Sequence, residues 1–216
     1  MTHEAQQAGV VAPTRDARSL RVAAVLALAA LAAVLVPLLL ISRFNHSYAD
    51  DWHYGVWAHL ALEQTGGNPL AALAAALNQV GVAWFEWQGT YSAIFVMALE
   101  PSVFGEQWYA LAAPLVLATL VAGTMFFTRV LLVELMGADR PTWLIVSCGL
   151  LCVQLLLQPS PVEGIFWFNS AVYYTTYHAA VLAMLGFLAR VCDPARAGRA
   201  RGSSVAAAVL AVLVAG

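Results

Sequence analysis

This 216-residue chain is 62% hydrophobic and 10% charged, whereas an ordinary soluble domain is roughly 45–50% apolar and about 25% charged. The composition indicates an integral membrane protein and excludes an ordinary soluble domain. The formal net charge of −2 says little, because in a membrane protein the placement of charge matters more than its sum.

The first apolar stretch covers residues 21–41 and has no charge after Arg21. About 20 helical residues cross a hydrocarbon core of about 30 Å, and this run exceeds the roughly 7–15 residues of a signal-peptide apolar region. We therefore predict a retained transmembrane helix that follows a polar tail over residues 1–20. Pro37 is expected to kink this helix mildly at most.

Three further spans are predicted from the apolar runs at about residues 108–135, 143–157 and 174–191, and another run begins at 204–216. That last run is too short to cross a bilayer. We therefore expect residues 21–216 to be the N-terminal part of one longer transmembrane domain. The predicted fold is an all-α, polytopic transmembrane helix bundle.

The arginines predict how this bundle is oriented. They gather before the first span, in the turn near Arg140, and again over residues 190–201, whereas the loop at 43–106 has only Arg43 and the stretch 158–173 has no basic residue. By the positive-inside rule, the N-terminus is predicted to be cytoplasmic and both of these loops to face outward.

The outer loop at 43–106 is predicted to be folded. Ser47 to Asp50 has the form of a capping box, and helical spacing follows until Gly66-Gly67. Asn68-Pro69 then has the form of a second helix start. Its apolar face would be Leu70, Leu73, Leu77 and Trp84, with Asn78 and Gln79 turned away. We expect interfacial helices on the outer leaflet; the alternative for 69–85 is a re-entrant or short spanning segment.

The paired acids Asp50 and Asp51 are the first candidates for chemistry. An aromatic segment (84–91) and a second acidic loop (158–174) are expected on the same side of the membrane. Carboxylates act as general bases or hold divalent cations, and aromatic faces stack on sugars or line lipid chains. The structural alternatives are that Asp50 completes the capping box, that Asp51 interacts with the helix dipole, and that Glu163 is a solvated loop residue.

Other chemistry finds no support in the sequence. It contains no Gly-rich phosphate loop and no H-E-x-x-H, C-x-x-C or G-x-S-x-G motif, so soluble nucleotide and metalloprotease chemistry is not indicated. We also expect no nucleic-acid partner.

A short tail, a first helix and an outer loop that opens with paired acids together resemble the GT-C superfamily of membrane glycosyltransferases. Within it, three segments are similar to a family of bacterial polytopic proteins of the DUF6056 type. They are Tyr48-Ala49-Asp50-Asp51-Trp52-His53-Tyr54, residues 84–91, and residues 163–174.

The resemblance implies a GT-C-like bundle in the bacterial inner membrane. Its donor would be a polyprenyl-phosphate-linked sugar reached at the outer face, among membrane lipids, and its acceptor a cell-envelope glycan or a protein. Asp51 or Asp50 would act as general base or hold a divalent cation (Mg²⁺ or Mn²⁺), with Asp51 the preferred catalyst and Asp50 the better placed for capping. The alternatives are a transporter or flippase and a non-catalytic accessory subunit.

The same resemblance places the substrate among the outer acids and aromatics. Members of the family often carry Gly-Arg where this chain has Gly89-Thr90, so the contact for the donor phosphate is expected to come from Arg43 or from an arginine beyond Gly216. The expected substrate-binding residues are Arg43, Trp84, Glu86, Trp87, Glu163, Trp167 and Asn169.

Overall fold

The computed structural model describes residues 17–196 and 200–216, and these residues form helices and turns without any strand. The predicted all-α class is therefore confirmed for the described residues. By length and composition, three helices could cross a membrane: Ala17–Phe44, Glu106–Leu135 and Phe168–Cys192. These apolar helices support the predicted membrane class.

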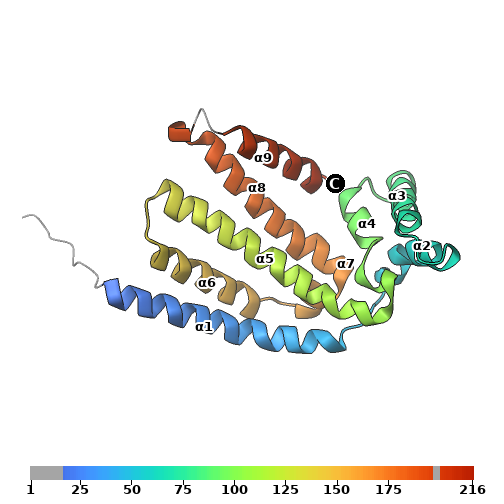
Figure 1. Cartoon of the computed structure of the whole chain (residues 1–216), viewed down its shortest axis with the longest axis horizontal. Coiled ribbons are helices and arrows are strands. Elements are labelled where there is room, and N and C mark those ends of the chain that lie inside the picture. The colour runs from blue at the N-terminus through green and yellow to red at the C-terminus, as the bar shows by residue number, and fades with distance from the viewer. Residues whose placement is uncertain (1–16, 197–199) are drawn as a thin grey trace, which may run out of the picture.

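The long helices lie side by side in one layer (Figure 1). From one edge to the other, their order is α1 (Ala17–Ile41), α6 (Arg140–Leu156), α5 (Ala112–Thr128), α8 (Tyr177–Cys192) and α9 (Arg201–Val214). In the membrane-length helix that contains α5, 39% of the most apolar stretch is buried. In the helix that contains α1, the corresponding share is 11%. Helix α5 therefore forms the core, and α1 presents most of its apolar surface outward, as expected for contact with lipid.

Several of these helices continue through shorter turns. α5 is preceded by the 3₁₀ turn η3 (Glu106–Leu111) and followed by the π-helical η4 (Arg129–Leu135). α8 is preceded by α7 (Phe168–Ala171) and the π-helical η6 (Val172–Thr176). The remaining short turns are η1 (Ser42–Phe44), η2 (Pro101–Phe104), η5 (Val162–Phe166) and η7 (Pro194–Arg196).

Glycines allow α5 and α8 to approach closely. A Cβ atom added at Gly123 would lie 2.5 Å from the carbonyl oxygen of Ala179. Near one end of the pair, Arg190 donates two hydrogen bonds of 2.9 and 2.6 Å to the Glu134 carboxylate and lies 4.8 Å from the centre of the Phe126 ring. These contacts fix α8, and the segment that leads into it, against the core helix.

Three further helices cover the other end of the layer (Figure 1): α2 (Asp50–Gln64), α3 (Pro69–Glu86) and α4 (Ser92–Met97). α2 stops just before Gly66 and Gly67, whose φ angles are 66° and 90°. The predicted start of α3 is confirmed, because the Asn68 side chain accepts a 3.0 Å hydrogen bond from the Leu70 N–H. The loop at 43–106 is therefore folded into helices, as expected.

The predicted capping box at the start of α2 is wrong. The N-cap position is Ala49, which makes no side-chain cap. The Ser47 hydroxyl donates instead to Glu106 at 2.7 Å, and the Tyr48 N–H donates to Asp51 at 3.0 Å. Because the Ser47 hydroxyl is bonded to Glu106, the carboxylate that accepts a backbone hydrogen bond at the start of α2 is that of Asp51, one residue later than predicted.

The expected orientation of Gln79, turned away from the apolar face of α3, is confirmed. Gln79 is 6% exposed, and it lies on the inward face of α3 together with Ala72, Ala76 and Ala83. Small side chains on this face let α3 approach its neighbours closely, and the predicted apolar face points outward. Its exposed residues are Leu70, Leu73, Leu77 and Trp84.

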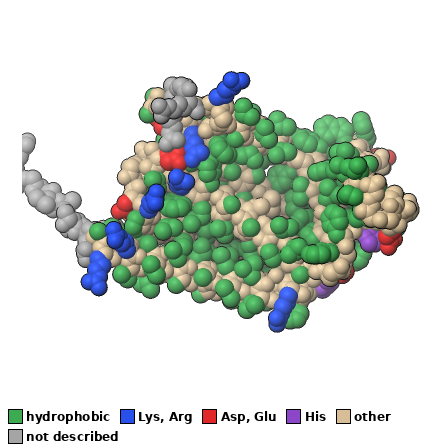
Figure 2. All heavy atoms as spheres, in the orientation of Figure 1, with side chains coloured by type: hydrophobic (Ala, Val, Ile, Leu, Met, Phe, Trp, Pro, Cys, Tyr) green, Lys and Arg blue, Asp and Glu red, His purple; other side chains and the backbone are tan. Residues whose placement is uncertain are grey.

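Charge is distributed unevenly between the two ends of the layer. Figure 2 shows most of the arginines at the end away from α2 and histidines at the α2 end, whereas acids are present at both ends. Arg43 is an exception among the described arginines, since it follows α1 at the α2 end. The predicted tail as far as residue 16, with Arg15, and the loop residue Arg199 lie outside the described residues. Helix α1 begins at Ala17, before the expected start at Arg21. The predicted span at 143–157 overlaps α6, which has 17 residues and is shorter than the three candidate membrane helices.

Candidate functional site

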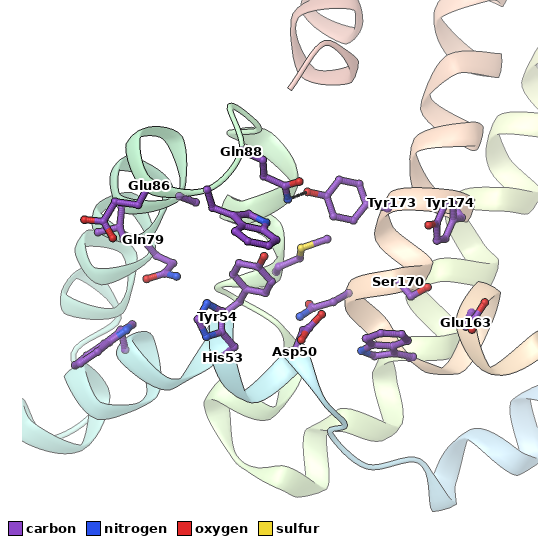
Figure 3. Close-up of a pocket in the computed structure, with 17 residues that line it drawn as sticks. Asp50, His53, Tyr54, Gln79, Glu86, Gln88, Glu163, Ser170, Tyr173 and Tyr174 are labelled. Carbon is purple, nitrogen blue, oxygen red and sulfur yellow. Dashed lines mark hydrogen bonds between the residues drawn. The ribbon is translucent and has the colours of Figure 1, made fainter.

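A cavity of about 780 Å³ opens between α2 and α3 on one side and residues 163–174 on the other (Figure 3). Small-molecule sites commonly measure roughly 300–1,000 Å³. The first wall consists of Asp50, His53, Tyr54, Trp57, Gln79, Val82, Ala83, Glu86, Trp87, Gln88 and Met97. The second wall consists of Glu163, Trp167, Asn169, Ser170, Tyr173 and Tyr174. The cavity thus combines acids, amides and many aromatic rings.

Asp51 connects the two walls from behind the cavity. Its side chain is fully buried. It accepts hydrogen bonds from the Tyr109 hydroxyl, from the Tyr48 N–H at 3.0 Å and from the Asn169 N–H at 3.2 Å. Because Asp51 bonds the backbone of Asn169, the neighbouring Asp50 and the Asn169 side chain are held at the same edge of the cavity.

Tyr109 extends this connection into the core helix. Its hydroxyl donates to Asp51 and accepts a 3.0 Å hydrogen bond from the Phe168 N–H. The side chain is fully buried and packs among apolar residues of α4 and α7. One tyrosine therefore joins the start of α2, the segment around α7 and the helix that runs on into α5.

The backbone just before Asp50 has an unusual conformation. Ala49 has a φ of 50° and a ψ of −114°, and such a conformation in a residue with a side chain costs on the order of 1–3 kcal/mol. The surrounding contacts compensate for this cost, since the neighbours of Ala49 are bonded to Glu106 and Asp51. Strained backbone that is held in this way is typical of functional sites.

Two buried acids behind the site have raised pKa values. Burial raises the pKa of Asp51, and hydrogen bonds from Tyr109, Tyr48 and Asn169 partly oppose that shift. Burial also raises the pKa of Glu100 to about 7, although Ser102 donates hydrogen bonds to it. Both carboxyl groups therefore bind a proton more readily than exposed acids do.

The walls also meet at the far end of the cavity. Gln88 donates a 2.8 Å hydrogen bond to the Tyr173 hydroxyl, which lies 3.1 Å from the Thr90 hydroxyl (Figure 3 shows the first of these bonds). The cavity is therefore held on both sides by hydrogen bonds rather than by loose loops.

Tyr54, which also lines the cavity, has a raised pKa. Burial is the main cause, and the proximity of Tyr173 and Asp50 contributes less.

Asn169 supplies an unused polar group. Its side chain is 3% exposed, lines the cavity, and has no hydrogen-bond partner for either amide atom among the described residues. The indole Nε1–H of Trp167, on the same wall, is likewise buried and without a partner there. Burying a polar group without a partner is unfavourable. Three N–H donors, two from the Asn169 amide and one from the Trp167 indole, and one acceptor oxygen are thus available for a ligand.

The structure brings together most of the residues predicted for the site. Those that line the cavity are Asp50, Glu86, Trp87, Glu163, Trp167 and Asn169. Asp51 lies behind it, fully buried. Trp84 is outside the lining, where its ring packs near Tyr91 and Gly89. Arg43 also lies elsewhere, with its guanidinium 4.6 Å from the centre of the Phe44 ring.

Sequence reasoning missed Tyr109, the second-wall tyrosine Tyr173, and the part played by Gln79. Tyr109 lies within an apolar span, where a buried polar group is costly without a partner, and this was the available signal. Gln79 was predicted to lie away from the apolar face of α3, and nothing in the local sequence indicates that this opposite face lines a cavity. Nothing in the local sequence indicates that Tyr173 receives a hydrogen bond from Gln88.

The described residues do not fit the expected divalent cation. No group of three or more His, Cys, Asp or Glu side chains is placed to hold a metal ion in 17–196 and 200–216. The Asp51 oxygens already accept bonds from three donors, whereas a cation needs free oxygen ligands.

No protein-family model, curated protein or solved structure matches this chain. The GT-C-like and DUF6056-type resemblances therefore stay predictions. Support for a function comes from the cavity and its position in the fold.

Proposed function

We propose that this chain is part of a GT-C-type membrane glycosyltransferase. It would take a sugar from a polyprenyl-phosphate carrier at the outer face of a bacterial inner membrane and transfer it to a cell-envelope glycan or a protein. The observation that carries the proposal is one cavity that combines an exposed carboxylate, an unpartnered buried amide and several aromatic rings at one end of a layer of apolar helices.

The lining suits a sugar. Sugars present hydroxyl groups around the ring edge and C–H groups on the ring faces, so they need hydrogen-bonding side chains beside aromatic surfaces. Asn169 and Trp167 offer the free polar groups, and Tyr54, Trp57 and Trp87 offer the rings. Few other ligand classes need both features at once.

Asp50 is the acid that we assign to the chemistry. It is exposed and lines the cavity, whereas Asp51 is fully buried with its oxygens occupied. In the proposed step, an acceptor hydroxyl oxygen attacks the anomeric carbon of the donor sugar. Its proton passes to Asp50, and the bond from the anomeric carbon to the phosphate oxygen breaks with its electron pair on the carrier phosphate.

The position of the cavity suits a lipid-linked donor. Large apolar side chains beside it are exposed, with Phe85 at 87% and Trp87 at 78%, and aromatic side chains favour the depth of the membrane interface. The arginine-rich ends of the helices lie away from α2 (Figure 2). By the positive-inside rule, these ends face the cytoplasm and the cavity faces outward.

Replacing Asp50 by asparagine tests the proposal. In membranes that contain this chain, Asp50→Asn is expected to lower the rate of sugar transfer from the lipid carrier by roughly 10²–10⁴-fold, the usual contribution of a general base. Asp139→Asn is the matched control, because Asp139 caps α6 by accepting from the Thr142 N–H at 2.8 Å, and asparagine caps equally well. Unchanged transfer in Asp50→Asn at equal protein level would defeat the catalytic assignment and favour an accessory subunit.

A further inference from the structure

We infer that the cavity is the acceptor subsite and that it selects a glycan unit without acidic groups. This inference rests on the proposed function and names the substrate class of its site. It follows from the charge of the lining together with the unpartnered polar atoms of the second wall.

Acidic side chains predominate among the charged groups of the lining. Asp50, Glu86 and Glu163 come from both walls, His53 is the one imidazole among the described lining residues, and no arginine is among them. The chain contains no lysine, and Arg43, which lies outside the lining, is over the Phe44 ring. A ligand that brought a carboxylate or a phosphate into this cavity would meet three carboxylates and neither an arginine nor a lysine to balance them.

The negative lining distinguishes acceptor from donor. A polyprenyl-phosphate donor brings a phosphate next to its reactive carbon, so its charged part is disfavoured inside the cavity. An acceptor brings hydroxyl groups, which donate readily to carboxylates. The cavity therefore suits the acceptor, with the donor phosphate at the mouth, and Asp50 is on the side from which it can take the acceptor proton.

The second wall indicates which acceptor fits. The Asn169 amide offers one acceptor and donors from its Nδ2, and the Trp167 indole offers one more donor. Neighbouring hydroxyls of a sugar ring can satisfy all of them. A quaternary ammonium ion would fit the aromatic rings and the acids, but it has no acceptor for these buried N–H groups. The unpartnered atoms thus favour a neutral sugar.

Saturation-transfer NMR on the full chain in lipid nanodiscs tests the inference with three probes: methyl glucoside, methyl glucuronide and glucose phosphate. The glucoside is expected to bind, and the two anions to bind roughly tenfold more weakly or worse. Replacing Asp50, Glu86 and Glu163 together by Asn or Gln should narrow that difference. Asn169→Ala should weaken glucoside binding, whereas Asn78→Ala, on the exposed side of α3, should not.

Three results would overturn the inference: anions that bind as tightly as the glucoside, a glucoside that does not bind to well-folded protein, or choline, used as a fourth probe, that binds more tightly than the glucoside. The proposed function fails separately. If transfer stays intact and depends on Asp50 but neutral and anionic sugars bind equally well, only the inference is contradicted. If neutral sugars bind preferentially but no sugar transfer occurs, the proposed glycosyltransferase function is contradicted, and the preference of the cavity for neutral sugars remains.

Discussion

Removing the Tyr109 hydroxyl should loosen the connection between the two walls of the cavity. Tyr109→Phe keeps the ring but deletes the bond to Asp51 and leaves the Phe168 N–H without its 3.0 Å acceptor. Tyr109 and Asp51 are both fully buried, so water does not replace either bond. Losing one hydrogen bond and orphaning one buried donor should cost about 2–4 kcal/mol of unfolding free energy.

Thermal unfolding of the detergent-solubilised chain, followed by tryptophan fluorescence, measures this cost. Tyr109→Phe should lower the unfolding midpoint by several degrees. Tyr174→Phe is the matched control, because Tyr174 also lines the cavity but is 71% exposed, and its midpoint should stay near that of the wild type. Equal midpoints for the two variants would refute the idea that Tyr109 and Asp51 hold the walls together.

Three other predictions follow from the described structure. Burial raises the pKa of Glu100 from 4.5 to about 7, so the folded state keeps a proton that the unfolded chain releases, and stability should fall by roughly 3 kcal/mol as the pH rises through that window. In Glu100→Gln, the unfolding free energy measured against pH should show a flatter slope. The remaining slope should come from Asp51, whose pKa is also raised. Gly123→Ala, which meets the Ala179 carbonyl, should destabilise the α5–α8 pair by about 1–3 kcal/mol in denaturant unfolding. Gly149→Ala, with open space around it, should not destabilise the chain. A reporter fused after Asn68 should be active only outside the cytoplasm, and cytoplasmic activity would contradict the proposed orientation.

The helical class and the helix starts marked by strong local signals could be predicted from the sequence. Apolar runs and the Asn68-Pro69 helix start can be identified from residues that are adjacent in the sequence. Helix α3 begins at Pro69, as predicted. The paired acids were also predicted to belong to one site; Asp50 lines the cavity, and Asp51 is buried behind it. What they do depends on distant partners, because the choice between Asp50 and Asp51 is made by Tyr109 and Asn169.

Two details of this end of the molecule depend on packing that the local sequence does not reveal. The predicted apolar face of α3 is exposed, and the opposite face, which packs against the protein, carries alanines and the buried Gln79. At the start of α2, the Ser47 hydroxyl donates to Glu106, about sixty residues away, and no local pattern indicates that bond.

The alanine face of α3 has a consequence for the breadth of the cavity. Ala72 and Ala76 are 2% and 0% exposed and do not line the cavity, yet they determine how near α3 lies to the helices packed against it. A larger side chain at either position would push the whole helix aside and carry Gln79 and Glu86 with it. Ligand size can therefore be adjusted over evolution by substitutions on the hidden side of a wall, at positions that no ligand touches.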